Sequence, residues 1–488
     1  MPAWLKELLP ILGLLTFIVI VVARLPKVDL GHSPRFLRRR FINWFPVGLT
    51  YAFLYMGRYN LNAAIGYAFD KAQFSNIYFW GTLTYGFSFV VNGPLTDKLG
   101  GKRTIIMAAL GSLGANVAAG LVVSGALDGQ CVPEAKRAAL VPVLSVIYAV
   151  NMYFQSFGAV SIVKVNAAWF HLRERGTFGG IFGILISLGL YFAYDWCSFI
   201  LKNSTPAYVF FVPAGILGVF ALLDFLFVKD TPGEAGLEDF DLGDASSGDD
   251  GPRKPVLEVV KMMVRNSAIM IIAAIEFCSG FLRNAILQYY KPFAEETGRA
   301  MASSRKACLV GAAQVKAASA PVLTEFVHDH WGMLNCMAGI SGGIVAGLIS
   351  DRVFGSRRGP VAAVLYGVMV IGAVAMFFLL PTMALGWAVV LMTLAIIGVH
   401  GMLSGTASMD FGGKKNVGIV VGVIDGFVYL GTAAEALVLG KVLPAKAQQH
   451  DPHNWWTWPA VMVPAALLGF ILSTRVWNAR PKPKAFSH

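Results

Sequence analysis

The hexapeptide GPLTDK at positions 93–98 has a second copy, GLISDR, at positions 347–352. Each copy lies at the end of an apolar run of spanning length and is followed by basic residues. A small residue lets two helices approach closely, and an acidic side chain can pair with nearby cations at a helix end. The repeat predicts two related halves, each with a gating latch; the alternative is that these charges only orient the helices in a membrane. The predicted latch residues are Asp97, Lys98 and Arg103 in one half, and Asp351 and Arg352 in the other.

The composition indicates a membrane protein. Of the 488 residues, 56% are hydrophobic and 14% are charged, and the mean hydropathy is +0.62. Soluble domains carry about 25% charged residues. The net charge of +12 does not indicate a nucleic-acid partner, because the basic residues lie between apolar runs and form no basic helix or aromatic platform. We therefore expect a lipid bilayer around the chain and no nucleic acid among its partners.

Apolar runs of about 20 residues, the length that crosses a bilayer as an α-helix, recur along the whole chain. We expect thirteen such helices, an initial one followed by twelve. They lie near 8–24, 41–66, 75–96, 104–124, 140–165, 177–200, 207–228, 266–290, 334–350, 360–380, 386–409, 416–440 and 456–477. The predicted fold class is an all-α membrane protein.

Basic residues set the expected orientation. We interpret the first run as an uncleaved anchor, because no small-residue cleavage site precedes the basic stretch that follows it. That stretch, between residues 24 and 40, is rich in arginine, so the C-terminal end of the first helix should face the cytoplasm. Twelve further crossings return the chain to the same side, which predicts a cytoplasmic C-terminus.

An acidic segment divides the chain into halves. Residues 229–265 contain acidic, small and turn-forming residues without apolar periodicity, which predicts a flexible cytoplasmic linker. The predicted divisions are an N-terminal anchor helix and basic segment at 1–40, a six-helix bundle at 41–228, the linker at 229–265, a second six-helix bundle at 266–477 and a cytoplasmic tail at 478–488.

Two arginines, Arg58 and Arg283, lie near the middle of predicted spans, one in each half. A guanidinium at this depth costs at least about 2.5 to 3.5 kcal/mol on insertion-derived scales, and it does not deprotonate. The pair predicts an anionic ligand. The alternative is an internal salt bridge: Glu276 lies two helical turns before Arg283 on the same face. Asp425, within a later span, is a second possible charge partner.

Other polar residues of the spans are candidates for holding the rest of a solute. Each taken singly can equally form a hydrogen bond between helices. His400 has the additional potential to change its charge near neutral pH. The candidate substrate-binding residues besides the two arginines are Tyr59, Asn62, Tyr85, Gln155, Asn284, Gln288 and His400.

Metal, cofactor and enzyme functions are not supported by the sequence. The His328-Asp329-His330 stretch has no second ligand pair at metal spacing. There is no phosphate-binding loop of the Gly-x-x-x-x-Gly-Lys-Ser/Thr type, which argues against transport driven by ATP. No convergent set of nucleophile, base and metal ligands is visible. We expect no cofactor and no catalytic residues.

Five stretches carry a resemblance to a known family. They are YMGRYN at 55–60, RERG at 173–176, KDTPGEAGL at 229–237, GSRRGP at 355–360 and MDFGGKK at 409–415. Together with the Gly-x-x-x-Asp-Lys/Arg repeat, the two sets of six helices and the acidic centre, they resemble the organophosphate:phosphate antiporters of the major facilitator superfamily. That family includes the glycerol-3-phosphate and hexose-phosphate transporters, and the resemblance covers about residues 41–477.

The resemblance implies a 12-helix major facilitator fold of two six-helix bundles, to which this chain adds one N-terminal transmembrane helix. It also implies that Arg58 and Arg283 clamp a substrate phosphate at the membrane midplane. The chain departs from glycerol-3-phosphate carriers in two places. A lysine expected after Tyr-Gly-Phe-Ser is replaced by Phe89, and no histidine occurs in the fifth helix, at 183–189. The identity of the solute is therefore open.

The predicted function is secondary active transport of an organic phosphate or similar anion, by alternating access and in exchange for inorganic phosphate. The alternatives are a proton-coupled symporter of an unphosphorylated organic anion and a transporter-like membrane sensor of a phosphorylated metabolite. We expect a monomer in the plasma membrane, specifically a bacterial inner membrane.

Overall fold

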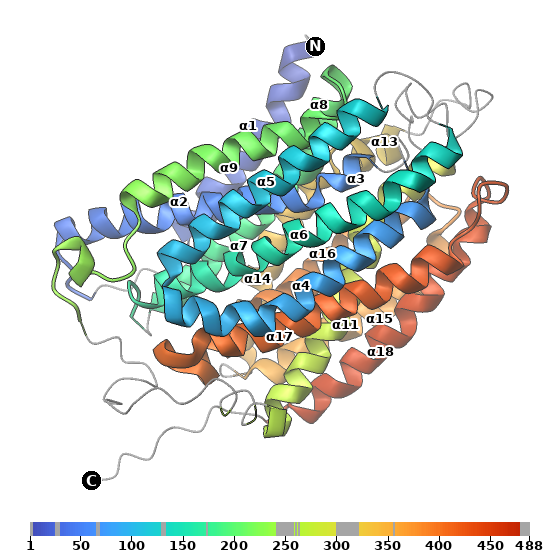
Figure 1. Ribbon diagram of the computed structural model, residues 1–488. Helices are drawn as coiled ribbons and strands as arrows, with labels where there is room; N and C mark the ends of the chain where they lie inside the picture. The colour runs from blue at the N-terminus through green and yellow to red at the C-terminus, as the bar shows by residue number, and fades with distance from the viewer. Residues whose placement is uncertain are drawn as a thin grey trace.

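The computed structural model describes residues 3–24, 30–64, 69–127, 133–171, 174–240, 264–298, 322–354 and 357–478, together with 258 and 261. These residues form long helices that run roughly parallel or antiparallel to one another in a single bundle (Figure 1). An extra helix, α1 (Ala3–Arg24), packs against α14 of the second half. The all-α prediction is confirmed.

The first half contains helices between residues 34 and 227. Their bounds are α2 (Pro34–Tyr59), α3 (Leu61–Ala64), α4 (Lys71–Leu99), α5 (Gly101–Leu127), α6 (Glu134–Ala167), α7 (Arg175–Tyr191), α8 (Cys197–Asn203) and α9 (Tyr208–Phe227). A π-helical segment at Phe192–Trp196 joins α7 to α8.

The second half contains helices between residues 267 and 475. Their bounds are α11 (Ser267–Glu296), α13 (Val322–Asp329), α14 (Trp331–Leu348), α15 (Arg358–Leu379), α16 (Leu385–His400), α17 (Ser408–Val442) and α18 (Thr457–Arg475). Two further π-helical segments extend α14 at Ile349–Val353 and join α16 to α17 at Gly401–Ala407.

Ten helical stretches of the described chain are long and apolar enough to cross a membrane. They include α5, α6, α9, α11 and the helices from α14 to α18, as well as the stretch that runs from α7 into α8. The helices α2 and α4 are not among the ten, although they have 26 and 29 residues. Both carry many polar residues, which lowers their hydropathy. The chain is therefore a multi-pass membrane protein, and the count of twelve plus one stays a prediction.

The two halves meet along two helix pairs. Helix α4 packs against α17, and α7 packs against α14. Small residues allow the first contact: a Cβ atom on Gly422 would lie 2.5 Å from the Phe89 carbonyl oxygen, and one on Gly86 would lie 3.0 Å from the Gly426 carbonyl oxygen. Side chains at these positions would push the backbones apart. The pairing brings the middle of α17 against the first half.

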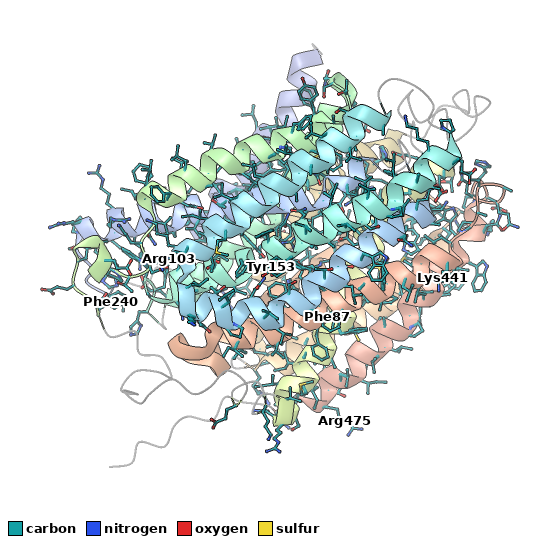
Figure 2. The ribbon with its side chains drawn as sticks, in the orientation of Figure 1. Phe87, Arg103, Tyr153, Phe240, Lys441 and Arg475 are labelled. Atoms are coloured by element: carbon teal, nitrogen blue, oxygen red, sulfur yellow. The ribbon has the colours of Figure 1, made fainter. Side chains whose placement is uncertain are left out.

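One end of the bundle carries the start of the linker, and we call it the linker end. Arg103 and Phe240 lie there, whereas Lys441 lies at the opposite end, which we call the far end (Figure 2). At the linker end, Asp230 accepts a hydrogen bond from the Lys102 backbone N–H at 2.7 Å. Burial raises the pKa of the Asp230 carboxyl above its usual value. Gly100 has a φ of +90° and no room for a Cβ beside this carboxylate, so the turn there requires glycine.

The contact of Asp97 that the structure shows is with a residue outside the predicted latch, and the latch itself stays a prediction. Asp97 pairs with Lys164 of α6 at 2.5 Å, whereas Lys98 and Arg103 are exposed. Lys98 follows Asp97 directly, and successive side chains on a helix diverge by about 100°. Arg103 lies beyond the turn at Gly100, on the next helix. In the second half Arg352 is exposed, and the side chain of Asp351 lies outside the described part of the structure.

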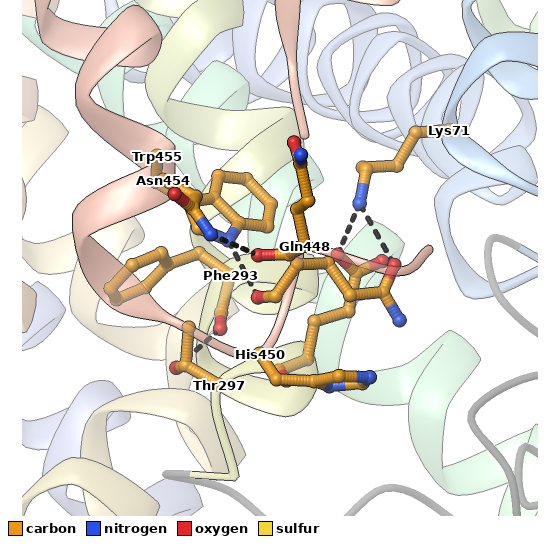
Figure 3. Close-up of polar contacts among 9 residues, drawn as sticks. Lys71, Phe293, Thr297, Gln448, His450, Asn454 and Trp455 are labelled. Carbon is orange, nitrogen blue, oxygen red and sulfur yellow. Dashed lines mark hydrogen bonds and ion pairs between the residues drawn. The ribbon is translucent and has the colours of Figure 1, made fainter. Parts of the chain in front are cut away.

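The far end is closed by contacts between the halves. Lys71 at the start of α4 pairs with Glu296 of α11 and donates to Gln449 Oε1 at 3.2 Å (Figure 3). On the other side of the bundle, the carboxylate of Asp195 accepts backbone N–H groups of Gly332 and Met333, at 2.7 and 2.9 Å. These are N–H groups of the first turn of α14, so a first-half carboxylate caps a second-half helix.

Candidate functional site

Arg58 lies near the end of α2 and is fully buried. Its guanidinium donates three hydrogen bonds: Nε to Gln155 Oε1 at 2.9 Å, Nη1 to the Tyr429 hydroxyl at 2.6 Å and Nη2 to the Tyr85 hydroxyl at 2.6 Å. The rings of Tyr55 and Tyr85 lie 4.5 Å from its central carbon. Aromatic faces stabilise a cation that is removed from water. Gln155 and Tyr85, two of the candidate substrate-binding residues, are thus in direct contact with Arg58.

A second set of polar groups holds Arg58 in place. Gln155 Nε2 donates to Ser112 Oγ and to Asn151 Oδ1, both at 3.1 Å. Asn151 in turn donates to the Gly57 carbonyl at 2.9 Å, and the Tyr148 hydroxyl donates to the Arg58 carbonyl at 3.1 Å. Because the groups that contact Arg58 are themselves hydrogen-bonded, the guanidinium has a fixed position.

Arg283 lies in the middle of α11 and is 5% exposed. Its guanidinium carbon is 5.6 Å from the centroid of the Tyr429 ring. Its Nη2 atom is buried and has no hydrogen-bond partner among the residues that the structure describes. A buried donor without a partner is rare and costly. Arg283 therefore differs from Arg58, whose three nitrogens all donate to the protein.

Tyr429 of α17 connects the two arginines, and sequence reasoning missed it. Its hydroxyl accepts from Arg58 Nη1, and its ring centroid lies 5.5 Å from the central carbon of Arg58 and 5.6 Å from that of Arg283. The available signal was spacing: Tyr429 follows Asp425 by one helical turn and shares its face. The two predicted arginines therefore face a common centre instead of lipid.

The sequence had suggested a salt bridge between Glu276 and Arg283, but the structure pairs Glu276 with a different residue. Its Oε2 atom lies 2.8 Å from His400 Nδ1 on α16. Its Oε1 atom is buried, and the described residues supply no hydrogen-bond partner for it. The reason for the difference is that α16 covers the face of α11 on which Glu276 lies. The predicted candidate His400 is thus joined to a carboxylate.

Asp425, the second predicted charge partner, accepts a hydrogen bond from the Ser404 hydroxyl. Ser404 lies four residues after His400, so the Ser404–Asp425 contact and the Glu276–His400 pair lie on neighbouring turns of the same stretch of helix.

The remaining candidates lie on the far-end side of the arginines. Asn284 donates to Glu435 Oε2 of α17, and Gln288 Nε2 donates to Asn284 Oδ1 at 3.1 Å. Glu435 was not predicted; it is fully buried, and only the tertiary pairing of α11 with α17 explains its contact. Asn62 is half-buried and donates to the Tyr194 hydroxyl at 3.1 Å, so it does not contact Arg58.

Tyr59 contributes its ring to the site. Its centroid lies 6.0 Å from the central carbon of Arg58 and 6.2 Å from the ring of Tyr194. Neither Arg58 nor Arg283 forms an ion pair with a carboxylate within the described ranges. The immediate hydrogen-bond partners of Arg58 are neutral. The centre of the bundle thus holds two cations suited to an anion with several acceptor oxygens.

Comparison with known proteins gives the family. A model of the Major Facilitator Superfamily matches residues 47–434. The glycerol-3-phosphate transporter of Bacillus subtilis is 25% identical over 478 residues, covering 93% of this chain and 94% of its own length. A probable hexose phosphate transport protein of Chlamydia muridarum is 22% identical, covering 92% of this chain and 94% of its own length.

A third relative has a different role. The membrane sensor protein UhpC of Escherichia coli is 23% identical, covering 94% of this chain and 96% of its own length. Among solved structures, a crystal structure of the D-xylose-proton symporter has a TM-score of 0.61 at 14% identity, covering 90% of this chain and 98% of that chain. This likeness shows the shared fold. The chain therefore belongs to the Major Facilitator Superfamily, its expected relationship to the organophosphate transporters of that superfamily is confirmed, and it is not an enzyme.

Proposed function

We propose that this protein is a secondary active transporter that moves an organic phosphate ester, or a similar anion, across the membrane in exchange for inorganic phosphate. The observation that carries the proposal is the pair of buried arginines from opposite halves, Arg58 and Arg283, whose guanidinium carbons both lie within 5.6 Å of the Tyr429 ring centroid. The names of the relatives from Bacillus and Chlamydia support a phosphorylated solute.

A phosphate group fits the chemistry of this centre. It carries about −1.5 to −2 charges and several acceptor oxygens. Arg283 Nη2 is a buried donor without a partner, and a guanidinium has five N–H groups, so Arg58 retains two N–H groups beyond its three protein contacts. A bound phosphate would accept from both arginines.

Electrostatics give a reason for exchange. Each guanidinium carbon lies within 5.6 Å of the Tyr429 ring centroid. For two cations roughly 11 Å apart at most, Coulomb's law with an effective dielectric constant of about 20 gives about 1.5 kcal/mol of repulsion or more. This repulsion would disfavour closure of the halves around an empty site, whereas the negative charge of a bound anion would cancel it. The empty carrier should then cross slowly and the loaded one quickly.

Alternating access requires a closed end that can open. The contacts of Lys71 with Glu296 and of Asp195 with α14 join the halves at the far end. We infer that these contacts break when the halves rock and the far end opens, while the site between the arginines changes its exposure. By the charge distribution of the loops, the linker end and the C-terminus would face the cytoplasm of a bacterial cell, and the protein would work as a monomer in the inner membrane.

Proteoliposomes test this proposal. The purified full-length chain is reconstituted, loaded with phosphate and presented with labelled phosphate or glycerol 3-phosphate outside. We expect rapid uptake that requires internal phosphate. Uptake of the same rate and extent from liposomes without internal phosphate would contradict exchange.

The Glu276–His400 pair favours a second candidate, proton-coupled symport of an unphosphorylated organic anion. A carboxylate and an imidazole 2.8 Å apart within the bundle can share and exchange a proton. This candidate predicts uptake of a carboxylate that depends on an imposed pH difference and needs no phosphate. A sensor function, suggested by the relative from Escherichia coli, predicts ligand binding without transport.

A further inference from the structure

The second half carries two buried acidic residues on the linker-end side of the arginine pair. Asp425 precedes Tyr429 by four residues on α17, so it lies about 6 Å along the helix axis from the residue that contacts both arginines. Glu276 on α11 precedes Arg283 by seven residues. Both carboxylates therefore lie on the linker-end side of the arginines, because α11 and α17 run in the same direction.

His400 and Ser404 complete this group from α16 and the π-helical segment after it. His400 Nδ1 contacts Glu276 Oε2 at 2.8 Å, and the Ser404 hydroxyl donates to Asp425 Oδ1. We call Glu276, His400, Ser404 and Asp425 the acidic subsite. Asp425 lies one helical turn before Tyr429, whose ring centroid is within 5.6 Å of both guanidinium carbons, and this spacing places the subsite next to the arginines.

Two buried polar atoms in this region lack a hydrogen-bond partner among the described residues. Glu276 is fully buried, and no described residue donates to its Oε1 atom. Arg283 Nη2, a donor, is likewise without a hydrogen-bond partner in the described chain. An unused acceptor in the subsite and an unused donor beside it match a solute with a cationic pole and an anionic pole.

We propose that the acidic subsite binds the ammonium group of a zwitterionic phosphate or phosphonate ester whose phosphorus group lies between Arg58 and Arg283. This inference rests on the proposed function and specifies its substrate class. A two- or three-carbon spacer between the phosphorus group and the nitrogen suits the one-turn separation of Asp425 from Tyr429. The ammonium would donate to the carboxylates of Asp425 and Glu276.

Charge balance supports this class over esters of neutral alcohols. The two arginines offset a dianionic phosphate, and an ionised Asp425 one helical turn from Tyr429 would then carry an uncompensated negative charge. An ammonium group on the solute offsets it. Near Glu276, Cys278 lies two residues further along α11 and the Tyr366 hydroxyl of α15 donates to the Ile275 carbonyl at 2.6 Å; neither side chain supplies a cation at neutral pH.

Matched esters test the inference. The assay measures uptake of labelled phosphate by phosphate-loaded proteoliposomes in the presence of one of two competitors. One competitor is phosphoethanolamine, and the other is ethyl phosphate, which has the same two-carbon chain without the ammonium group. We expect phosphoethanolamine to inhibit at a concentration at least about tenfold lower. Asp425→Asn, which retains an acceptor for Ser404, should reduce this ratio to within about threefold.

A second buried aspartate provides the matched control. Asp224 is fully buried and accepts from the Thr50 hydroxyl at 2.7 Å, which repeats the Asp425–Ser404 arrangement away from the arginines. Asp224→Asn should retain the preference for the ammonium ester. Equal inhibition by the two esters in the unmodified protein would overturn the inference, as would an unchanged ratio in Asp425→Asn.

Thermal-shift titrations with the same two esters separate the inference from the proposed exchange. Preferential stabilisation by phosphoethanolamine, lost in Asp425→Asn, would support the subsite even where no phosphate uptake occurs. Phosphate uptake without any preference in either measurement would refute the subsite and leave exchange standing.

Discussion

Lysine substitutions of the two buried arginines should have different effects on stability. Arg58 donates from three nitrogens to Gln155, Tyr429 and Tyr85. Arg283 makes no hydrogen bond from Nη2 to the described residues. Lysine keeps the positive charge but presents all of its donors at one nitrogen, so it cannot reproduce a planar fork.

The magnitudes follow from the lost contacts. A hydrogen bond to a charged group contributes about 1.5 to 3 kcal/mol. Arg58→Lys loses at least one such bond and leaves a buried acceptor unpaired, so we expect the free energy of unfolding to fall by about that amount. Arg283→Lys should leave the free energy of unfolding near that of the unmodified protein. For anion binding, the loss of one charged hydrogen bond corresponds to an affinity about ten- to hundredfold weaker in either variant.

Thermal unfolding of both variants in one detergent compares their stability. The rise of the unfolding midpoint on adding phosphate to the same samples compares their affinity for the anion. The expected pattern is a lowered unfolding midpoint for Arg58→Lys only, with weakened phosphate stabilisation for both variants. Equal loss of stability in the two variants would show that Arg283 has structural partners like those of Arg58. Undiminished phosphate stabilisation in Arg283→Lys would refute its assignment to the anion.

Three further substitutions test the ends of the bundle. Asp195→Asn weakens the cap on α14, a contact class that contributes about 1 kcal/mol, so buried Cys336 should be alkylated several times faster; an unchanged rate would show that the cap does not hold the far end closed. Asp97→Asn should lower the unfolding midpoint, and a double-mutant cycle with Lys164→Met should give a coupling energy of about 0.5 to 3 kcal/mol; purely additive effects would remove the ion pair as a stabilising contact. Because burial raises the pKa of Asp230, its ionised form disfavours folding above that pKa, and this penalty disappears as the pH falls through it. Asp230→Asn should therefore raise the unfolding midpoint relative to the unmodified chain at pH 7 more than at pH 4, and a difference independent of pH would contradict this.

The fold and the two arginines were predictable because they depend on burial alone. A guanidinium in the middle of an apolar run must face the protein interior, and two halves of similar sequence place Arg58 and Arg283 at comparable depths. The sequence also identified Gln155 and Tyr85 as polar residues of the spans. Their contact with Arg58 depends on how α2, α4 and α6 pack, which no local pattern states.

The partners of the charged residues were not predictable in the same way. Helical spacing correctly puts Glu276 and Arg283 on related faces of α11, but it cannot say that α16 brings His400 to Glu276. Lys98 and Arg103 were predicted as partners of Asp97 because they lie close to it in the sequence, whereas Lys164 is close to Asp97 only in space. Tyr429 carries no charge and lies in an apolar helix; its spacing from Asp425 indicates only the helix face on which it lies, and its contact with Arg58 depends on the packing of α17 against the first half.

The position of Tyr429 suggests how an anion could couple the two halves. The hydrogen bond from Arg58 to Tyr429 joins the first half to the second, whereas Arg283 and Tyr429 both belong to the second half. In the proposed alternating-access cycle, rocking of the halves would lengthen this bond, because its two ends belong to different halves. A phosphate that accepts from Arg58 and Arg283 at once would replace a neutral hydroxyl by a charged acceptor across the same boundary. Charge-assisted hydrogen bonds are about twice as strong as neutral ones. The solute would then stabilise the closed intermediate more than the empty protein can by itself, which is the condition for a carrier that crosses when loaded.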